Sequence, residues 1–256
     1  MFSINENPIN GKVPKPIAFI QGGKYDKEVI YVHDDPDDSL FYEIDLTEDD
    51  INAKIKPIHA VNGRISGYFA GSAGSGKSTM MAEYIKSYKK LYPHRTVYII
   101  SRTDFKHDPA FKDLKMTQLN ITKPIDFVKE GYQQCMFVFD DVSTFSDKEM
   151  QQNIFHLIKD LLEVARKNEI SVLISNHLIN PNEKSLGRVI MNELDLMCIF
   201  PRGASRHHIK YALHHYFGVS NQIINRILNS SSRYVIISKN YPNYVLEEQH
   251  AYPLHD

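Results

Sequence analysis

Residues 71–79 read Gly-Ser-Ala-Gly-Ser-Gly-Lys-Ser-Thr, which matches the spacing G-x-x-x-x-G-K-S/T of a phosphate-binding loop. The apolar run 65–70 precedes this stretch, and the helix-prone run 79–91 follows it. A strand, a glycine-rich loop and a helix in this order form the context in which the pattern binds phosphate. The alternative is a glycine-rich turn that holds a lysine by chance, and the flanking strand and helix favour the nucleotide site.

The residue types in this loop suit phosphate chemistry. Its glycines permit backbone dihedral angles closed to other residues, so successive N–H groups can converge on one phosphate. The N-terminus of the following helix adds a partial positive charge. We expect Lys77 to reach the β- and γ-phosphates of a nucleotide and the hydroxyl of Ser78 to ligate Mg²⁺. The predicted nucleotide-binding residues are Gly71, Ser72, Ala73, Gly74, Ser75, Gly76, Lys77, Ser78 and Thr79.

Length and composition are those of a globular enzyme with one main domain. The 256 residues are 42% hydrophobic and 24% charged, which is ordinary usage and enough for a substantial core. The sequence holds no run of about 18 apolar residues and no N-terminal signal pattern, so we expect neither a membrane span nor secretion. Cys135 and Cys198 lie in apolar, strand-like runs without metal-ligand spacing, and we interpret both as core residues in a reducing compartment.

The formal net charge of −1 hides an asymmetry along the chain. Residues 1–60 hold 6 Lys/Arg against 12 Asp/Glu, whereas residues 61–256 hold 24 against 19. The acidic runs 34–38 and 48–50 are interpreted as solvated loops. The weakly basic remainder permits contact with nucleic acid, although a protein that wraps DNA statically would be more basic.

The pattern of the chain changes near residue 60. Before it, short β-like runs at 16–21, 28–33 and 40–44 predict a small β-rich extension. After it, strand and helix patterns alternate, which predicts an α/β fold with a mainly parallel sheet covered by helices on both faces. We therefore expect two domains, 1–60 and 61–256. The further strands are predicted at 96–101, 135–139, 170–175, 194–200, 232–238 and 243–249, and helices at 147–168, 204–217 and 219–229.

An acidic pair follows one of these strands. The apolar run 136–139 ends in Asp140 and Asp141, which is the Walker B pattern. A buried strand would carry the carboxylates to the edge of the sheet where the phosphates lie. We expect Asp140 to hold Mg²⁺ opposite Ser78 and Asp141 to polarise the attacking water. The alternative is a strand that simply ends in acids where it reaches solvent.

Asn176 ends the next predicted strand, 170–175. In motors with a strand between the two Walker elements, a polar residue at this position senses the γ-phosphate, and Asn176 is the candidate here. The alternative is an asparagine that closes a turn after a strand, which is a common use of this residue.

Three stretches together, 71–79, 137–141 and 165–176, resemble the HerA/FtsK-type packaging ATPases of large double-stranded DNA viruses and virophages. The runs 196–203 and 234–246 have a similar look, so the likeness covers roughly residues 61–250. The chain departs from the family pattern at two points. Asn176 stands where the superfamily typically has Gln, and Arg166-Lys167 stands where viral members often have Arg-His.

The resemblance implies a RecA/FtsK-like P-loop fold, with ATP and Mg²⁺ as cofactors and a homo-oligomeric ring that moves double-stranded DNA into a capsid without sequence preference. It also implies capsid proteins as partners and a location in the viral factory of the host cytoplasm and in the virion. ATP would lie between neighbours, so one subunit must offer an arginine to the next. Arg166 matches the family's finger position, and Arg188 and Arg202 are alternatives. Each could also be an ordinary surface arginine.

Two other function classes remain open. A nucleoside or nucleotide kinase would need an acceptor pocket and an Arg-rich lid, and the sequence shows no compact arginine cluster. A non-motor P-loop NTPase that reads guanine would carry an Asn-Lys-x-Asp motif, which the chain lacks.

The pairs His207-His208 and His214-His215 are interpreted as a polar helix face rather than a zinc site.

Overall fold

The computed structural model describes most of the chain, and within it the chain divides into two compact units. One unit is the continuous segment Asn62–Met197, and the other combines Met1–Val61 with Cys198–Asp256. The acidic run 48–50 and most of the acidic run 34–38 lie outside the described residues. The described residues are 1–4, 6–9, 11–34, 40–47, 51–59, 63–179 and 184–254.

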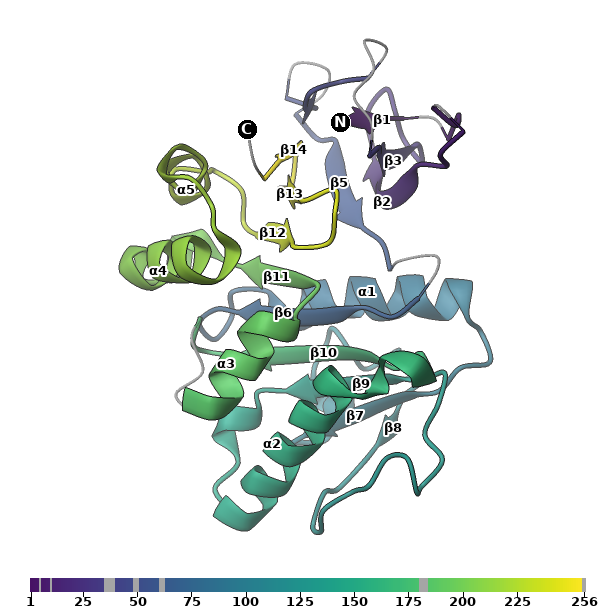
Figure 1. The fold of residues 1–256 in the computed structure, drawn as a ribbon, viewed down its shortest axis with the longest axis vertical. Coiled ribbons are helices and arrows are strands. Elements are labelled where there is room, and N and C mark those ends of the chain that lie inside the picture. Colours follow the sequence, from purple (N-terminus) through teal and green to yellow (C-terminus); the bar gives the residue numbers. More distant parts are fainter. Residues whose placement is uncertain are drawn as a thin grey trace. The chain divides into compact units, whose positions relative to one another are not determined.

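The 62–197 unit is built on a parallel sheet with the strand order β6-β10-β9-β7-β8 (Figure 1). Each neighbouring pair in this order runs parallel. The strand β10 therefore lies between β6, which leads into the glycine-rich loop, and β9, which ends in the acidic pair. The strands are β6 (Ser66–Ala70), β7 (Val97–Ser101), β8 (Thr117–Gln118), β9 (Met136–Asp140) and β10 (Ser171–Asn176).

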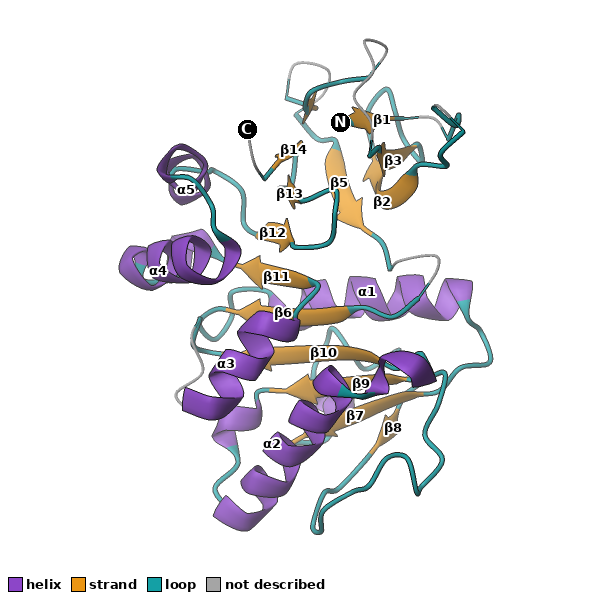
Figure 2. Cartoon of the chain, viewed as in Figure 1, coloured by secondary structure: helices purple, strands orange, loops and turns teal. Residues whose placement is uncertain are grey.

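The middle strands are covered on both faces. Every residue of β6 and β10 is buried, which a strand achieves only when layers pack above and below it. Helix α1 (Lys77–Leu91) lies behind the sheet, and α2 (Lys148–Glu163) and α3 (Lys184–Glu193) lie in front of it (Figure 2). The predicted α/β class with a mainly parallel, helix-covered sheet is confirmed.

Helix ends follow local chemistry. Helix α2 begins after Asp147, whose side chain accepts hydrogen bonds from the backbone N–H groups of Glu149 and Met150. The helix predicted for 147–168 ends earlier, because the chain tightens into a 3₁₀ turn over Ala165–Asn168 and Glu169 then adopts the left-handed conformation with φ 53°. Helix α3 was not predicted, since Gly187 interrupts its helical pattern.

Helix α1 packs against the sheet with an aromatic and aliphatic face. Tyr84 and Tyr88 are both buried, and the ring of Tyr84 meets the ring of Phe69 edge-on at a centroid distance of 5.8 Å. Tyr84 thus packs against β6, and Tyr88 meets the ring of Tyr92, the C-cap residue of the same helix, at a centroid distance of 5.2 Å. In the described part of the chain, no helix has the length and apolar character needed to cross a membrane.

The second unit holds two groups of antiparallel strands and two helices. The first group has the order β1-β3-β2-β5, and the second has the order β4-β14-β13-β12. The chain passes from one unit to the other within β11 (Leu196–Ile199). The elements are β1 (Phe2–Ser3), β2 (Lys15–Gln21), β3 (Val29–Val32), β4 (Ile44–Asp45), β5 (Lys54–Pro57), α4 (Arg206–Phe217), α5 (Asn221–Leu228), β12 (Val235–Ser238), β13 (Tyr244–Leu246) and β14 (His250–Pro253).

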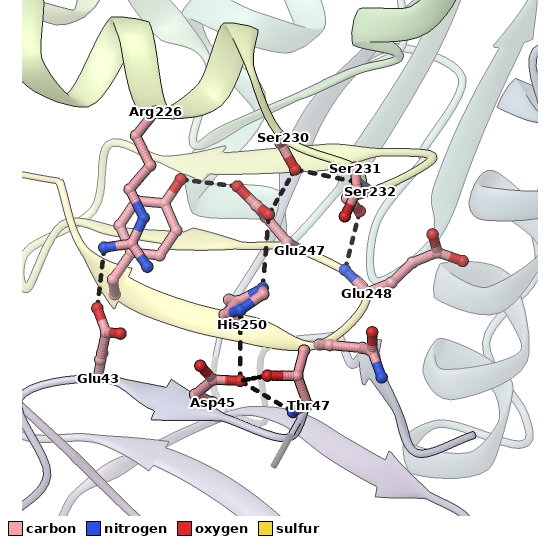
Figure 3. Close-up of polar contacts among 12 residues, drawn as sticks. Glu43, Asp45, Thr47, Arg226, Ser230, Ser231, Ser232, Glu247, Glu248 and His250 are labelled. Carbon is pink, nitrogen blue, oxygen red and sulfur yellow. Dashed lines mark hydrogen bonds and ion pairs between the residues drawn. The ribbon is translucent and has the colours of Figure 1, made fainter. Parts of the chain in front are cut away.

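A polar network ties the C-terminal strands of this unit to β4 (Figure 3). The buried carboxylate of Glu247 accepts hydrogen bonds from Tyr252 Oη at 2.8 Å and Ser230 Oγ at 2.6 Å. His250 lies between two carboxylates, with Nδ1 3.7 Å from Glu247 and Nε2 3.3 Å from Asp45. A buried carboxylate is costly without hydrogen-bond partners, and Glu247 finds its partners in this network. The network also holds β4 next to the C-terminal strand β14 through His250 and Asp45.

The same unit explains a difference from the predicted domain division. The hydroxyl of Tyr234 donates to the carbonyl of Ile55 at 2.6 Å, and the N–H of Ile55 donates to the carbonyl of Glu248 at 2.7 Å. The boundary expected at residue 60 lies next to the observed one at 61. Residues 198–256 group with the N-terminal segment instead of with the phosphate-loop unit, because their strands pair with β4 and bond to β5.

Candidate nucleotide site

The glycine-rich loop leaves β6 and enters α1 through two residues in the left-handed region. Gly74 has φ 74°, and Gly76, the N-cap of α1, has φ 112°. A side chain at either position would strain the backbone. The loop is anchored to β10, because the N–H of Gly71 donates to the carbonyl of Asn176 at 3.1 Å.

Lys77 lies at the first turn of α1 and is only 6% exposed. Its Nζ donates to the carbonyl of Gly71 at 2.9 Å and to that of Ser72 at 3.3 Å. The same atom lies 3.7 Å from Oδ1 of Asp141. The structure thus brings the predicted phosphate lysine together with one member of the acidic pair.

Asp140 ends β9, where two serine hydroxyls donate to its carboxylate. Ser175 Oγ lies 3.0 Å from Oδ1, and Ser101 Oγ lies 3.2 Å from Oδ2. Burial and the neighbouring charge of Asp141 raise the pKa of the Asp140 carboxyl, and the two serine hydrogen bonds oppose this shift. Asp140 is half-buried, and no described Lys, Arg or His forms an ion pair with it, so its carboxylate is the type of group that a divalent metal ion would stabilise.

Asp141 has a strained backbone, with φ 45° and ψ 47°. The conformation is supported by a hydrogen bond from its N–H to Ser175 Oγ at 2.8 Å. It turns the carboxylate toward two cationic or potentially cationic groups, Lys77 Nζ at 3.7 Å and His177 Nε2 at 3.4 Å. Strain of this kind persists where the surrounding contacts hold the residue in place.

Asn176 stands at the carboxyl end of β10, between the loop and the acidic pair. Its amide oxygen accepts from Ser143 Oγ at 3.2 Å and from the N–H of Leu178 at 3.3 Å. The strand order places it where a γ-phosphate sensor is expected. The bond to Leu178 is also the turn contact that the alternative interpretation expects.

The three candidate arginines lie away from the glycine-rich loop and the acidic pair of the same subunit. Arg166 is exposed in the 3₁₀ turn that precedes β10, at the opposite end of this strand from Asn176. The six residues of β10 span about 17 Å, so Arg166 lies at the opposite edge of the sheet from the glycine-rich loop of the same subunit. Arg188 is exposed on α3. Arg202 belongs to the other unit, and its guanidinium donates to the carbonyl of Ser231.

Three site residues were not predicted from the sequence, namely Ser101, Ser175 and His177. Ser101 and Ser175 hold Asp140, and His177 lies against Asp141. Each stands at or just past the carboxyl end of β7 or β10. Because the carboxyl ends of parallel strands meet at one edge of a sheet, polar residues at these ends were the available signal.

The raised pKa of Asp140 predicts a pH-dependent cost to the fold. Between the ordinary value of 3.8 and the raised value, the folded state binds the proton more tightly, so stability is lost as pH rises through this range. Asp140→Asn should therefore raise the melting midpoint at pH 7 without divalent cation. The gain should vanish below pH 3.8. Thermal unfolding from about pH 3.5 to 7.5 checks this, and a variant no more stable at pH 7 contradicts it.

The sequence has a relative among the proteins of virophages. The uncharacterized protein V3 of Sputnik virophage is 32% identical over 243 residues, which are 94% of this chain and 96% of V3. No family model matches the chain.

One solved structure shares the fold at low sequence identity, and a second aligns with a lower score. The genome packaging NTPase B204 of Sulfolobus turreted icosahedral virus 2, in complex with sulfate, aligns with a TM-score of 0.50 and 14% identity, over 73% of this chain and 97% of B204. The pCW3 conjugation coupling protein TcpA aligns with a TM-score of 0.47 and 14% identity, over 94% of this chain and 78% of TcpA. The chain belongs to the family of protein V3 of Sputnik virophage and has the fold of the HerA/FtsK-type viral packaging ATPases.

Proposed function

We propose that the protein hydrolyses ATP to move double-stranded DNA into a viral capsid. One observation carries the proposal: Lys77, the acidic pair and Asn176 converge behind a glycine-rich loop at one edge of the sheet, with β10 between the two Walker elements. The fold shared with B204, described as a genome packaging NTPase, agrees with this function.

The residues present fit a magnesium nucleotide. The hydroxyl of Ser75 is buried and has no hydrogen-bond partner among the described residues, so a phosphate oxygen would satisfy it. Ser78 and Asp140 would hold Mg²⁺. The ion would offset the negative charge of the phosphates and of the half-buried Asp140.

The side chains of this chain divide the work of hydrolysis. In the reaction, a water oxygen bonds to the γ-phosphorus while the bond to the β–γ bridging oxygen breaks, so ADP and phosphate leave. Asp141 would orient and polarise that water, and its contacts with Ser175 and His177 support this role. Lys77 stabilises the charge that develops on the phosphoryl oxygens, and Asn176 contacts the γ-phosphate.

The position of Arg166 supports an assembly of several copies. An arginine at the far end of β10 serves a neighbour's nucleotide better than its own, which fits a ring with ATP between subunits. We further propose that the partners of the ring are double-stranded DNA and capsid proteins. The protein would act in the viral factory of the host cytoplasm and be present in the virion. Particles examined by electron microscopy with an ATP analogue and DNA should show the ring.

The ATPase rate with and without double-stranded DNA tests the function. A translocase should turn over faster when DNA is present, and its affinity for DNA should fall steeply with salt because its contacts are to phosphates. A phosphotransferase should instead wait for a small acceptor. Turnover that ignores DNA but accelerates with a nucleoside or nucleotide acceptor would replace the motor with a kinase.

The two acids should separate in mutants. Asp140→Asn should weaken Mg²⁺-dependent nucleotide binding and hydrolysis together, because metal ligation acts in both ground and transition states. Asp141→Asn should leave nucleotide bound but stalled, because activation of water acts mainly in the transition state. Fluorescent nucleotide titration and phosphate release measure the two effects. Normal binding and full turnover in both variants would refute the Walker B assignment.

A further inference from the structure

A long stretch of the second unit carries no negative charge. Residues 196–246 contain no Asp or Glu, although 31 acids in 256 residues would place about six in a segment of this length. The same 51 residues contain six Lys/Arg and four His. An acid-free, cation-bearing segment of this length favours a polyanion as its partner.

The helix α4 gathers the four histidines of this segment and one of its two lysines on one face. At about 100° per residue, six of its side chains fall within an arc of roughly 160°, and all six are at least partly exposed. The opposite arc holds Ile209, Ala212, Leu213 and Phe217, which are buried. The exposed set, hereafter the histidine face, consists of His207, His208, Lys210, Tyr211, His214 and His215.

Interactions within the helix keep this face ordered. The rings of Tyr211 and His215 stack at a centroid distance of 5.1 Å with an interplanar angle of 18°. Arg206 is already used, since its guanidinium donates to the carbonyl of Leu228 at 2.9 Å and to Asn229 Oδ1 at 3.0 Å. Arg206 thus fixes α5 against α4 (Figure 1), and Lys210 and the histidines remain directed to solvent.

We propose that the histidine face is a binding surface for the phosphate backbone of double-stranded DNA. The inference rests on the proposed function and names where the DNA is held. Binding of phosphates needs exposed cations and hydrogen-bond donors, and this face offers the ammonium of Lys210, the rings of four histidines and the hydroxyl of Tyr211. A protein partner would call for a larger apolar centre than the single exposed ring of Tyr211 that the face carries. The observations therefore favour DNA over an acidic protein.

A matched pair of variants tests the surface. The test variant replaces three histidines and one lysine of the face by glutamine, and the control variant makes the same replacements at exposed positions of the other unit. Both variants have the same net charge, so a difference between them reports location. The test variant is His207→Gln, His208→Gln, Lys210→Gln and His214→Gln, and the control variant is His94→Gln, His107→Gln, Lys123→Gln and His156→Gln.

The experiment measures duplex affinity by fluorescence anisotropy across a salt series, and ATPase rate with and without duplex. The test variant should bind at least about 10-fold more weakly than wild type at low salt. Its salt dependence should flatten by about 0.9 in the log–log slope for each phosphate that the face no longer neutralises. The stimulation of its ATPase rate by DNA should fall. Basal ATPase rate and melting midpoint should match wild type, and the control should behave as wild type throughout.

Three outcomes would overturn the inference. Equal loss of affinity in both variants would mean that overall charge, not this face, governs binding. Unchanged DNA affinity in the test variant would remove DNA from the face. If poly-glutamate displaces duplex from wild type but not from the test variant, the face belongs to an acidic protein. If wild type itself neither binds duplex nor responds to it, the proposed function fails, which is distinct from a failure of this surface alone.

Discussion

Lys77→Ala is expected to abolish ATP hydrolysis, with a loss of at least about 10²–10³ in turnover. The ammonium of Lys77 is buried at the loop and close to Asp141, and no other described side chain of the loop supplies a positive charge there. Its removal takes a cation from the position where phosphoryl oxygens gain charge. Phosphate release should fall to background, and fluorescent ATP should bind more weakly.

Lys86→Ala on the same helix is the matched control. Lys86 is exposed and pairs with Glu83 at 3.2 Å, so its loss should leave turnover near wild type. Near wild-type hydrolysis in Lys77→Ala would remove the basis of the nucleotide site. A melting midpoint that drops in Lys77→Ala alone would show that the lysine also supports the fold, and ATP binding then separates the two roles.

Arg166→Ala should leave ATP binding intact and lower turnover by roughly 10³-fold or more, as expected for an arginine that completes a neighbour's site. Mixing these subunits with Lys77→Ala subunits should restore part of the activity. The intact pocket of one variant then meets the intact arginine of the other across an interface. A residue that acts only within its own subunit could not be complemented in this way.

Lys167→Ala is the control for this experiment, because Lys167 is the exposed neighbour of Arg166 in the same 3₁₀ turn. Full turnover of Arg166→Ala as an isolated monomer, indifferent to DNA, would refute the motor. Loss of turnover without complementation would instead move the finger to Arg188 or Arg202 and leave the fold assignment unchanged.

The meeting of the glycine-rich loop and the acidic pair at one edge of the sheet could be predicted from sequence, because its signals are local. The spacing of 71–79 and the apolar run before Asp140 each lie within a few residues, and both lead to the same edge of the sheet. In the order β6-β10-β9, the strand β10 lies between the two strands that lead into or end in the Walker elements. The hydrogen bonds of Ser101 and Ser175 to Asp140 join residues 39 and 35 positions apart, so these partners could be found only once the strand order was known.

The parts that were missed depend on residues far apart along the chain. The length of β4 illustrates this, because 40–44 reads as a strand by composition but only Ile44–Asp45 finds a partner, in β14. The same holds for α2, which the apolar periodicity extends to 168 although the chain must turn to enter β10. The propensity of its residues indicates which element a segment can form, whereas its contacts with distant segments decide where the element ends.

The bond from Tyr234 to Ile55 joins residues that are 179 positions apart, and this separation sets an order of folding. The 62–197 unit is one uninterrupted segment, so it can form its sheet as soon as β10 has been synthesised. The second unit cannot, because β4 and β5 must wait for β12–β14, which follow the whole 62–197 segment along the chain. Pairings of such separation are slow to close. During synthesis the N-terminal strands therefore remain without these partners while the nucleotide-binding unit is already folded.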